Sequence, residues 1–480
     1  MRAIYTIKRL KDIASALLTQ TRLRKHEQWT RRELEEFQQK GLAALVKHAV
    51  GHSPFYRKLY RDININEKII LDSLPIIDKA TIMENFDIVV TEPRLKLIEL
   101  QDHIAQLSRD DYHLGEYRIV TTSGSSGLKG VFVFNRKEYS TVLACGLRCS
   151  SFMGVSPRLP KRWRGALIGA SSPMHVTNRF YSIVDVGLHN FQRLAATVGI
   201  EHLVESLNAF KPDWLCAYTS IASVLADEQR EGRLDIHPRV ISTNAEVLTM
   251  KMKQKITETW GVQPFNTYGM SESGLVFASD CSFHRGLHVY EDLFIAEVVD
   301  EHNSAVPEGS PGYKLLITNL FNYTQPLIRY EVSDMITMAK ESCPCGRPFR
   351  LIAEIGGRTE DIIYLRNHQG ERVPVHPLHL ENPLESLRDV KEYQIFQEED
   401  KLRVVIVLLQ GGSEEEVSKR LREKVRNSLD SLGAICPEIQ VRFVGAIRGD
   451  PQKMGKLKRI KSIVRTEEKS RRISAGPGDT

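Results

Sequence analysis

Thr122-Ser-Gly-Ser-Ser-Gly-Leu-Lys129-Gly130 is the most informative stretch of this chain. It is a glycine- and hydroxyl-rich loop that ends in a lysine, and it lies between two apolar runs, 117–121 and 131–134. Glycines let backbone N–H groups turn toward an anion, while hydroxyls and a lysine add donors and positive charge. Because the flanks are β-branched and aromatic, we expect a hairpin loop inside a folded domain that binds phosphate groups.

The spacing of this loop distinguishes it from a Walker loop. Gly124 is not followed at the required distance by Gly-Lys-Ser/Thr, because Lys129 is followed by Gly130. A flexible Gly/Ser linker remains the alternative interpretation of the same composition.

Length and composition predict a globular protein with several domains. The chain has 480 residues, of which 41% are hydrophobic and 26% charged, and this length predicts roughly two to four domains. The net charge of +6 is small for this length, and no aromatic residues are interleaved with the basic runs near the two ends. We therefore expect no nucleic-acid partner.

Membrane insertion is also not expected. No apolar run approaches the roughly 18 residues that a membrane span requires. Apolar residues recur at helical spacing between positions 4 and 18, at Ile4, Ile7, Leu10, Ile13 and Leu17. Such a basic amphipathic helix could touch a membrane surface, but packing against its own domain is the favoured interpretation. Seven cysteines without framework-like spacing predict a cytoplasmic location.

The pattern along the chain predicts an α/β protein. Short apolar runs alternate with helical stretches from about residue 117 to 356, which is typical of a large multi-sheet α/β domain. We expect a helical N-terminal extension at 1–44, a large domain at 45–356, a small mobile α+β C-terminal domain at 357–466 and a flexible tail at 467–480. Gly356-Gly357 is the expected hinge. Within the small domain, Ser413-Glu-Glu-Glu416 predicts the start of an amphipathic helix.

Further candidate residues lie far from the loop in the sequence. Tyr268-Gly-Met-Ser-Glu272 contains a carboxylate that could hold Mg2+ against phosphate oxygens. Asp334 follows Leu327-Ile-Arg-Tyr330 and could accept hydrogen bonds from a ribose diol. Arg358 follows the glycine pair, and Lys456 lies in a basic stretch near the C-terminus. Each signal is weak when taken alone.

Together, and in this order, these motifs resemble those of the adenylate-forming ligase superfamily. The phenylacetate–coenzyme A ligase group is the most similar part of it. Further matching segments are His52-Ser-Pro-Phe-Tyr56, Leu74-Pro-Ile-Ile-Asp-Lys79, Asn244-Ala-Glu246 and Gly286-Leu-His-Val-Tyr-Glu-Asp292. The resemblance covers residues 45 to 461 and implies a large adenylate-forming domain followed by the small mobile domain.

The resemblance implies an ATP site. The loop would hold the β- and γ-phosphates, Asn244 to Glu246 would line the adenine pocket with Tyr268 and Gly269 on its other side, and Asp334 would hold the ribose together with Arg358. The implied nucleotide-binding residues are Thr122, Ser123, Gly124, Ser125, Ser126, Gly127, Lys129, Asn244, Ala245, Glu246, Tyr268, Gly269, Ser271, Asp334 and Arg358.

The resemblance also implies catalytic roles. Glu272 would bind Mg2+, and Lys456 would bridge the attacking carboxylate and the α-phosphate. Glu360 takes the hinge position that aspartate or lysine usually holds, and His175 could line the acid pocket or be structural. Glu331 and Ser333 stand where the family commonly has arginine and glycine.

Three cysteines and a histidine predict a second site. Cys343-Pro-Cys345 is a C-x-C pair, and Cys281 and His288 precede it by about 55 to 60 residues. Three thiolates and one imidazole would form a closed, structural zinc site. His284 is the competing fourth ligand, and buried free cysteines are the alternative.

Three functions are consistent with these residues. The favoured one is ATP-dependent activation of a small, aromatic carboxylic acid to an acyl-adenylate, followed by transfer to the thiol of coenzyme A. The alternative is the same adenylation with an amine or a carrier-protein thiol as acceptor. A non-catalytic, zinc-stabilised nucleotide-binding protein is the third. The sequence leaves the oligomeric state open.

Overall fold

A computed structural model describes residues 2–65, 67–122, 130–156, 161–170, 176–185, 187, 189–375, 377–387, 389–398, 401–447 and 458–462. The chain divides into two compact units, and the division falls between Ile355 and Gly356. Gly357 adopts a φ of 101°, a backbone conformation that favours glycine. Each unit is described by itself below.

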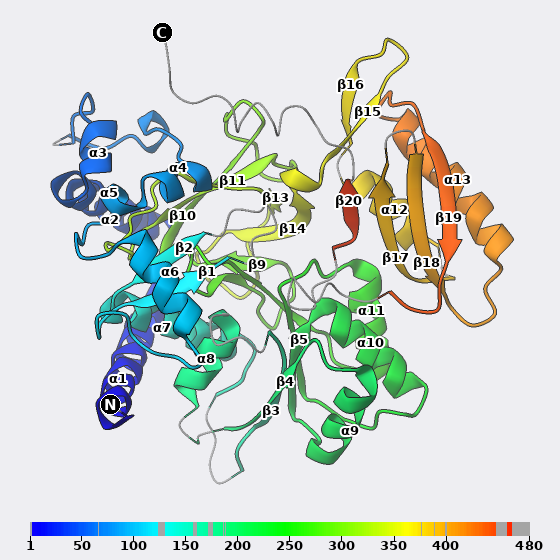
Figure 1. Cartoon of the computed structure of the whole chain (residues 1–480), viewed down its shortest axis with the longest axis horizontal. Coiled ribbons are helices and arrows are strands. Elements are labelled where there is room, and N and C mark those ends of the chain that lie inside the picture. The colour runs from blue at the N-terminus through cyan, green and yellow to red at the C-terminus, as the bar shows by residue number, and fades with distance from the viewer. Residues whose placement is uncertain are drawn as a thin grey trace. The chain divides into compact units, whose positions relative to one another are not determined.

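A nine-stranded sheet forms the centre of the first unit. Its strands are β3 (Arg164–Gly169), β4 (Asn190–Ala195), β5 (Trp214–Tyr218), β6 (Val240–Asn244), β7 (Phe265–Gly269), β8 (Val276–Ser279), β9 (Leu287–Val289), β13 (Asp334–Met338) and β14 (Leu351–Arg358). In the described part of the chain they lie in the order β13-β14-β9-β8-β7-β6-β5-β3-β4. Figure 1 labels β3, β4, β5, β9, β13 and β14. This architecture confirms the predicted α/β class.

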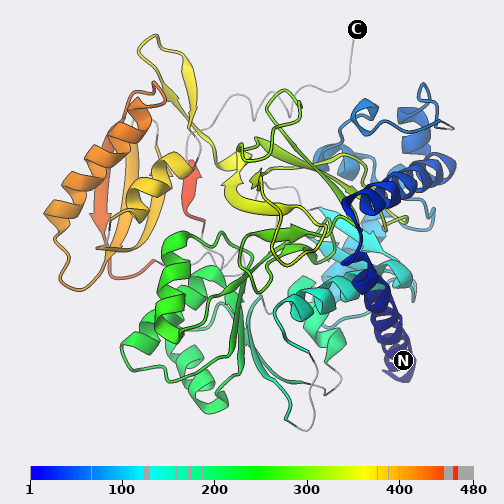
Figure 2. The ribbon, with the colours of Figure 1, turned by 180° about the vertical axis from the view of Figure 1, so that it is seen from behind.

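One half of this sheet is parallel. Strands β4, β3, β5, β6 and β7 pair in parallel. The helices that connect them are α8 (Val176–Val184), α9 (Ile200–Phe210), α10 (Thr219–Arg230) and α11 (Met250–Trp260). Figures 1 and 2 show α9, α10 and α11 gathered beside these strands. Because parallel strands end at one edge of a sheet, the residues that follow β3, β5, β6 and β7 are brought together there.

Helices and two smaller sheets complete the first unit. The helices are α1 (Arg2–His26), α2 (Arg31–His52), α3 (Pro54–Leu59), α4 (Lys79–Glu84), α5 (Phe86–Val89), α6 (Leu97–Gln106) and α7 (Arg136–Phe152). The smaller sheets contain β1 (Arg118–Thr121) with β2 (Val131–Phe134), and β10 (Phe294–Val299) with β11 (Lys314–Asn319) and β12 (Tyr330–Val332). Thr30 and Glu33 form a capping box that starts α2. Residue 44, the expected end of a separate extension, lies inside α2.

The second unit is a small α+β fold. It contains β15 (Ile363–Arg366), β16 (Arg372–Val375), α12 (Leu378–Glu385), β17 (Val390–Gln397), β18 (Lys401–Leu408), α13 (Glu414–Asp430), β19 (Glu438–Phe443) and β20 (Ile460–Ser462). Four of these strands form a sheet with the order β19-β18-β17-β20. The predicted helix is confirmed: the Ser413 side chain accepts a hydrogen bond from the Glu416 N–H, and Val417, Leu421, Val425 and Leu429 are buried.

The first helix packs on its own unit, but only in part through the predicted face. Among the described residues, no helix is long and apolar enough to cross a bilayer. Helix α1 lies against α7 and buries Asp12, Ala16 and Leu23. Ile7, Leu10 and Leu17, which we expected to pack against the domain, are exposed. Ile13 of the same apolar series packs against the core, so the expected packing is confirmed for only part of the series, because α1 carries apolar residues on two opposite faces.

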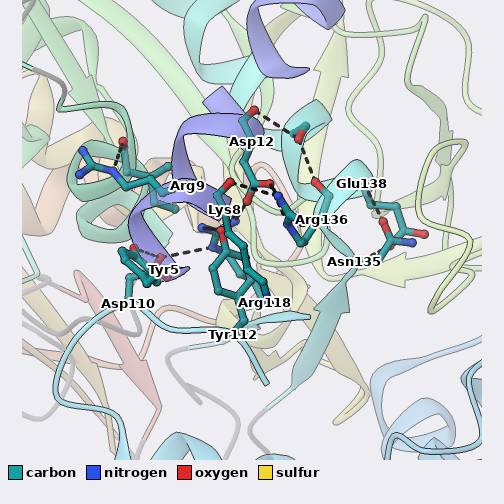
Figure 3. Close-up of polar contacts among 12 residues, drawn as sticks. Tyr5, Lys8, Arg9, Asp12, Asp110, Tyr112, Arg118, Asn135, Arg136 and Glu138 are labelled. Carbon is teal, nitrogen blue, oxygen red and sulfur yellow. Dashed lines mark hydrogen bonds and ion pairs between the residues drawn. The ribbon is translucent and has the colours of Figure 1, made fainter. Parts of the chain in front are cut away.

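A buried polar network fixes the inner face of α1 (Figure 3). Asp12 lies 2.8 Å from both Arg118 and Arg136 and accepts a hydrogen bond of 2.6 Å from Tyr112. Asp110 pairs with the other side of Arg118, with 3.3 Å between Oδ2 and Nε. Arg118 has no solvent exposure and is the first residue of β1. The N-terminal helix is therefore attached directly to the strand that leads into the candidate phosphate loop.

Replacing Asp12 with alanine is expected to lower the free energy of unfolding by about 3 kcal/mol, because it leaves a buried guanidinium with one carboxylate partner fewer. Chemical denaturation measures this change. The exposed pair Arg32–Glu36, with side chains 88% and 54% exposed, provides the control, since Glu36→Ala should change stability by less than about 1 kcal/mol. Equal effects of both substitutions would contradict a stabilising role of the network.

Candidate functional site

The base of the glycine-rich loop is a closed antiparallel hairpin. Strands β1 and β2 pair with Thr121 opposite Val131. One step further, the Thr122 N–H donates to the Gly130 carbonyl at 3.0 Å, and the Gly130 N–H donates to Thr122 Oγ1 at 2.8 Å. The predicted hairpin is confirmed. Ser123 to Lys129, the loop residues themselves, lie outside the described residues.

Two buried amides hold the second strand of the hairpin. Gln325 accepts a hydrogen bond from the Val133 N–H at 2.8 Å and donates to the Val131 carbonyl at 3.1 Å. Asn322 donates to the Val133 carbonyl at 3.1 Å. Neither side chain is solvent-exposed. These amides bond the backbone groups of β2 that a neighbouring strand would otherwise pair with. They therefore hold the two-stranded hairpin in place.

The predicted adenine-binding segments lie at the carboxyl edge of the parallel strands. Asn244, at the end of β6, is in register with Tyr218 of β5 and Thr267 of β7. Tyr218 also accepts a hydrogen bond of 3.0 Å from the N–H of Ala170, which follows β3. The ends of four strands therefore meet, and Tyr268 directly follows one of the paired residues. In open parallel sheets, ligands usually bind outside the carboxyl ends of the strands.

The turn after β6 has an unusual conformation. Ala245 has a φ of 68°, a left-handed conformation that is uncommon for alanine and is often found at functional sites. The Glu246 carboxylate accepts a hydrogen bond of 2.8 Å from the Ser220 N–H, in the first turn of α10. This side chain caps a helix, a role that the sequence did not indicate. That Asn244, Ala245 and Glu246 line the adenine pocket stays a prediction.

The structure brings together Tyr268 and Asp334, which are 66 positions apart. The Tyr268 hydroxyl donates to the Asp334 carboxylate, and both side chains are buried. Asp334 is the first residue of β13. Asp334, which is expected to accept hydrogen bonds from the ribose, is thus held beside Tyr268, which is expected to border the adenine.

Ser271 and Glu272 connect this region to the hairpin. The Ser271 hydroxyl donates to the Thr121 carbonyl at 3.0 Å. Glu272 is 7% exposed, and the Tyr330 hydroxyl donates to its Oε1 at 3.4 Å. Burial, followed by the nearby Glu272 charge, raises the pKa of Tyr330, so this phenol remains a donor. The sequence did not indicate this role of Tyr330, although Tyr330 ends the Leu327-Ile-Arg-Tyr330 run that precedes Asp334.

The structure leaves the place of several other predicted residues relative to this region open. His175 and Lys456 lie outside the described residues. The division between the two units falls inside β14, whose last residue is Arg358. Glu360 lies in the short 3-10 helix that follows, Thr359–Asp361. The aromatic residues nearest His175 in the sequence are buried in the hydrophobic core; they are Trp163, Phe180 and Tyr181.

The predicted cysteine–histidine cluster is assembled in the first unit. The ligand atoms of Cys281, His288, Cys343 and Cys345 all lie within 4.8 Å of one another. The Cys281 and Cys343 sulfurs are 3.7 Å apart, and His288 Nε2 is 3.4 Å from the sulfurs of Cys281 and Cys345. The competing His284 instead contacts Asp280, with Nδ1 2.6 Å from Oδ2.

These distances fit a tetrahedral zinc ion. Zn–S and Zn–N bonds of about 2.3 and 2.0–2.1 Å at tetrahedral angles place two sulfurs about 3.8 Å apart, and a sulfur about 3.5 Å from a nitrogen. Burial, with a smaller contribution from Arg347, lowers the pKa of His288 to about 4, which leaves the imidazole neutral, as a metal ligand must be. Cys281 and His288 come from the β8–β9 region, and both other cysteines come from the turn between β13 and β14. The four residues therefore connect β8, β9 and the β13–β14 turn at the end of the sheet where β13 carries Asp334.

Comparison with known proteins gives a consistent result, although no family model matches the chain. A phenylacetate-coenzyme A ligase from Thermus thermophilus is 28% identical over 393 residues, which cover 76% of this chain and 78% of the relative. A phenylacetate-coenzyme A ligase from Escherichia coli (strain K12) is 23% identical over 475 residues, covering 92% and 98%. Protein CapK from Staphylococcus aureus is 22% identical over 409 residues, covering 82% and 83%.

Solved structures show the same fold. A 2-hydroxyisobutyryl-CoA ligase in its postadenylation state superposes with a TM-score of 0.73 at 18% identity, covering 94% of this chain and 93% of that structure. An anthranilate CoA ligase in complex with anthranoyl-AMP gives a TM-score of 0.52 at 16% identity, covering 71% and 64%. The predicted resemblance is confirmed: the chain is similar to phenylacetate–coenzyme A ligases over most of its length, and it has the fold of adenylate-forming CoA ligases.

Proposed function

We propose that this protein is an AMP-forming acid–thiol ligase that uses ATP to activate a small aromatic carboxylic acid and then transfers the acyl group to coenzyme A. The observation that carries the proposal is the buried group of Tyr268, Asp334, Glu272 and Tyr330 beside the carboxyl edge of the parallel strands, joined through Ser271 to the base of the glycine-rich hairpin. Two relatives that are phenylacetate-coenzyme A ligases support the choice of acid and acceptor.

The chain's own residues would position ATP. Backbone N–H groups of the loop and Lys129 would hold the β- and γ-phosphates, while Asp334 would accept hydrogen bonds from the ribose hydroxyls. Gly269 would let the adenine approach the backbone closely. A Cβ at this position would lie 2.3 Å from the Leu275 carbonyl oxygen, so the site requires glycine.

Glu272 is the proposed magnesium ligand. A single protein carboxylate fits this ion, because Mg2+ is commonly held by one or two carboxylates together with substrate phosphates and water. Bound Mg2+ would neutralise phosphate charge and orient the leaving group. The hydrogen bond from Tyr330 would fix the orientation of the Glu272 carboxylate.

The first half-reaction needs alignment and charge neutralisation rather than a general base. A carboxylate oxygen of the acid attacks the α-phosphorus, the bond from that phosphorus to the bridging oxygen breaks, and pyrophosphate leaves with its electron pair. Both reactants are anions, so positioning and positive charge lower the barrier. Lys456 would supply that charge between the acid and the α-phosphate.

In the second half-reaction the thiol sulfur of coenzyme A attacks the acyl carbon. The bond from that carbon to the AMP oxygen breaks, AMP leaves and the thiol proton passes to solvent. Glu360, next to the division between the two units, is the proposed hinge for the movement that exchanges Lys456 for the thiol.

We also propose that Cys281, His288, Cys343 and Cys345 bind one structural Zn2+. Four protein ligands leave no open coordination position, so the ion would stabilise the fold without taking part in catalysis. Free thiolates of this kind persist in a reducing compartment, which supports a cytoplasmic location.

A panel of aromatic and aliphatic acids tests the proposed function. We expect pyrophosphate release that depends on an aromatic acid and Mg2+, and a decrease of about 10²–10³-fold in Glu272→Gln, because one charge-stabilising group is lost. Glu301→Gln, at a carboxylate that is 63% exposed, is the matched control and should retain the wild-type rate.

The acceptor is identified in the same reactions. Adding coenzyme A should convert the adenylate to a thioester with release of AMP. Adenylate formation without thioester would instead indicate an amine or carrier-protein thiol as acceptor. Nucleotide binding without pyrophosphate release for any acid would reject the enzyme assignment.

A further inference from the structure

Helix α1 has two opposite faces, and within the described part of the chain one is buried against the protein while the other is largely exposed. Asp12, Ala16 and Leu23 are 1–3% exposed and pack toward α7. The polar contacts of Tyr5, Asp12 and their partners fix this side (Figure 3). The orientation of the other side relative to solvent is therefore set by a buried network.

The outer face carries a continuous apolar stripe. Ile7, Leu10, Leu17 and Leu18 are 55%, 52%, 50% and 66% exposed, and Ala14 between them is also exposed. With about 3.6 residues per turn, these positions fall within an arc of about 100° on the helix surface. Single exposed apolar residues need no explanation, but an aligned stripe on one helix indicates an interaction surface.

Every charged residue on the exposed side of α1 is basic. Lys11 and Arg22 border the stripe on one side, Arg24 borders it on the other, and Lys25 follows it along the helix; all four are exposed. The helix contains one acidic residue, Asp12, which is buried. An apolar stripe with basic borders matches the chemistry of an anionic membrane surface.

The charges also indicate which partner binds the stripe, an anionic membrane surface or a second copy of the chain. In a symmetric pair of α1 helices, the bordering positions of one helix would face the same basic residues of the other. No acidic residue on the exposed face of α1 could pair with them, so like charges would repel at the seam. A surface of anionic lipid headgroups avoids this repulsion and receives the apolar side chains between its acyl chains.

We propose that the outer face of α1, defined by Ile7, Leu10, Ala14, Leu17 and Leu18 with the bordering Lys11, Arg22, Arg24 and Lys25, docks the protein reversibly on anionic lipid bilayers. The helix lies in the plane of the interface and keeps its inner face on the protein. Because part of the attraction is electrostatic, binding weakens as salt is added.

Sedimentation of the full-length protein with lipid vesicles tests the proposal. We expect binding to phosphatidylcholine vesicles that contain phosphatidylglycerol, little binding to phosphatidylcholine alone, and release at high salt. Leu10→Gln with Leu17→Gln, and separately Lys11→Glu with Arg22→Glu, should each weaken binding at least about tenfold.

Matched controls change equally exposed residues elsewhere. Ile70→Gln with Met250→Gln alters apolar side chains that are 66% and 75% exposed, and Lys40→Glu with Lys58→Glu reverses two exposed charges on α2 and α3. Both controls should bind like the wild type, and the melting temperature of every variant shows whether it is folded.

Three results would overturn the proposal. The first is absence of wild-type binding to the anionic vesicles. This includes the case in which α1 instead mediates a dimer, which the Leu10 and Leu17 substitutions would dissociate. The second is equal binding to neutral and anionic vesicles. The third is unchanged binding of the folded α1 variants, which would place the lipid contact on another surface.

Discussion

Replacing Lys456 with alanine is expected to lower the rate of acid-dependent pyrophosphate release by about 10³–10⁵-fold, the range that one transition-state cation provides in phosphoryl transfer. The reason is electrostatic, because an anionic carboxylate must approach an anionic α-phosphate and the substitution removes the charge proposed to lie between them. Pyrophosphate release at saturating ATP, acid and Mg2+ measures the change.

The same variant should separate the two half-reactions. When a presynthesised acyl-adenylate is supplied with coenzyme A, Lys456→Ala should form thioester at close to the wild-type rate, because the lysine is assigned to the first step alone. Lys461→Ala, which removes a lysine near an aromatic ring in the same basic segment, is the control and should retain adenylation. A similar loss in both half-reactions would indicate a folding defect, and no loss in either would remove Lys456 from the mechanism.

Replacing Cys343 with serine is expected to release zinc and to lower the free energy of unfolding by at least about 4 kcal/mol, the size of effect associated with loss of a bound metal. Cys343 is 4% exposed, and its cluster joins the ends of four neighbouring strands. Metal analysis of protein purified without chelator should give about one equivalent of zinc in the wild type, and chemical denaturation measures the stability.

Cys436→Ser is the matched control for this experiment. Cys436 is half-buried in the second unit and outside the cluster, so its replacement should leave metal content unchanged. If Cys343→Ser kept one equivalent of zinc, the assigned ligand set would be wrong. If the wild type contained no metal and the variant lost no stability, the cluster would be a set of buried thiols.

Much of the fold follows from local patterns in the sequence. The runs 240–243, 314–318 and 401–409 predict strands that the structure confirms to within about a residue at either end. The hairpin around the glycine-rich loop and the helix after Ser413 are also confirmed. These elements are readable because turn residues and capping side chains act on neighbours a few positions away.

Contacts between distant segments could not be predicted in the same way. The hydrogen bonds from Tyr268 to Asp334 and from Tyr330 to Glu272 span 66 and 58 positions, and depend on the order of the strands. The motifs named most of these residues, but not which of them touch. Glu246 shows the same limit, because its motif did not indicate that its carboxylate accepts a hydrogen bond from the first turn of α10.

Helix α1 shows a different limit. Its period correctly predicts a helix, but a helix with apolar residues on two faces does not reveal which face is inside. The deciding residue is Asp12, a charged side chain that is buried because Arg118 and Arg136 arrive from β1 and α7. A charge normally marks the outer face, so the charge of Asp12 pointed to the wrong side.

Single-turnover trapping of the acyl-adenylate tests the central claim most directly. The wild-type protein is mixed with ATP, Mg2+ and phenylacetate, and its products are analysed before and after a chase with coenzyme A. The proposed function predicts one enzyme-bound acyl-adenylate and one pyrophosphate per active site before the chase, and conversion of that adenylate to phenylacetyl-CoA and AMP after it. Release of ADP and phosphate, or absence of the adenylate with every acid of the panel, would contradict it.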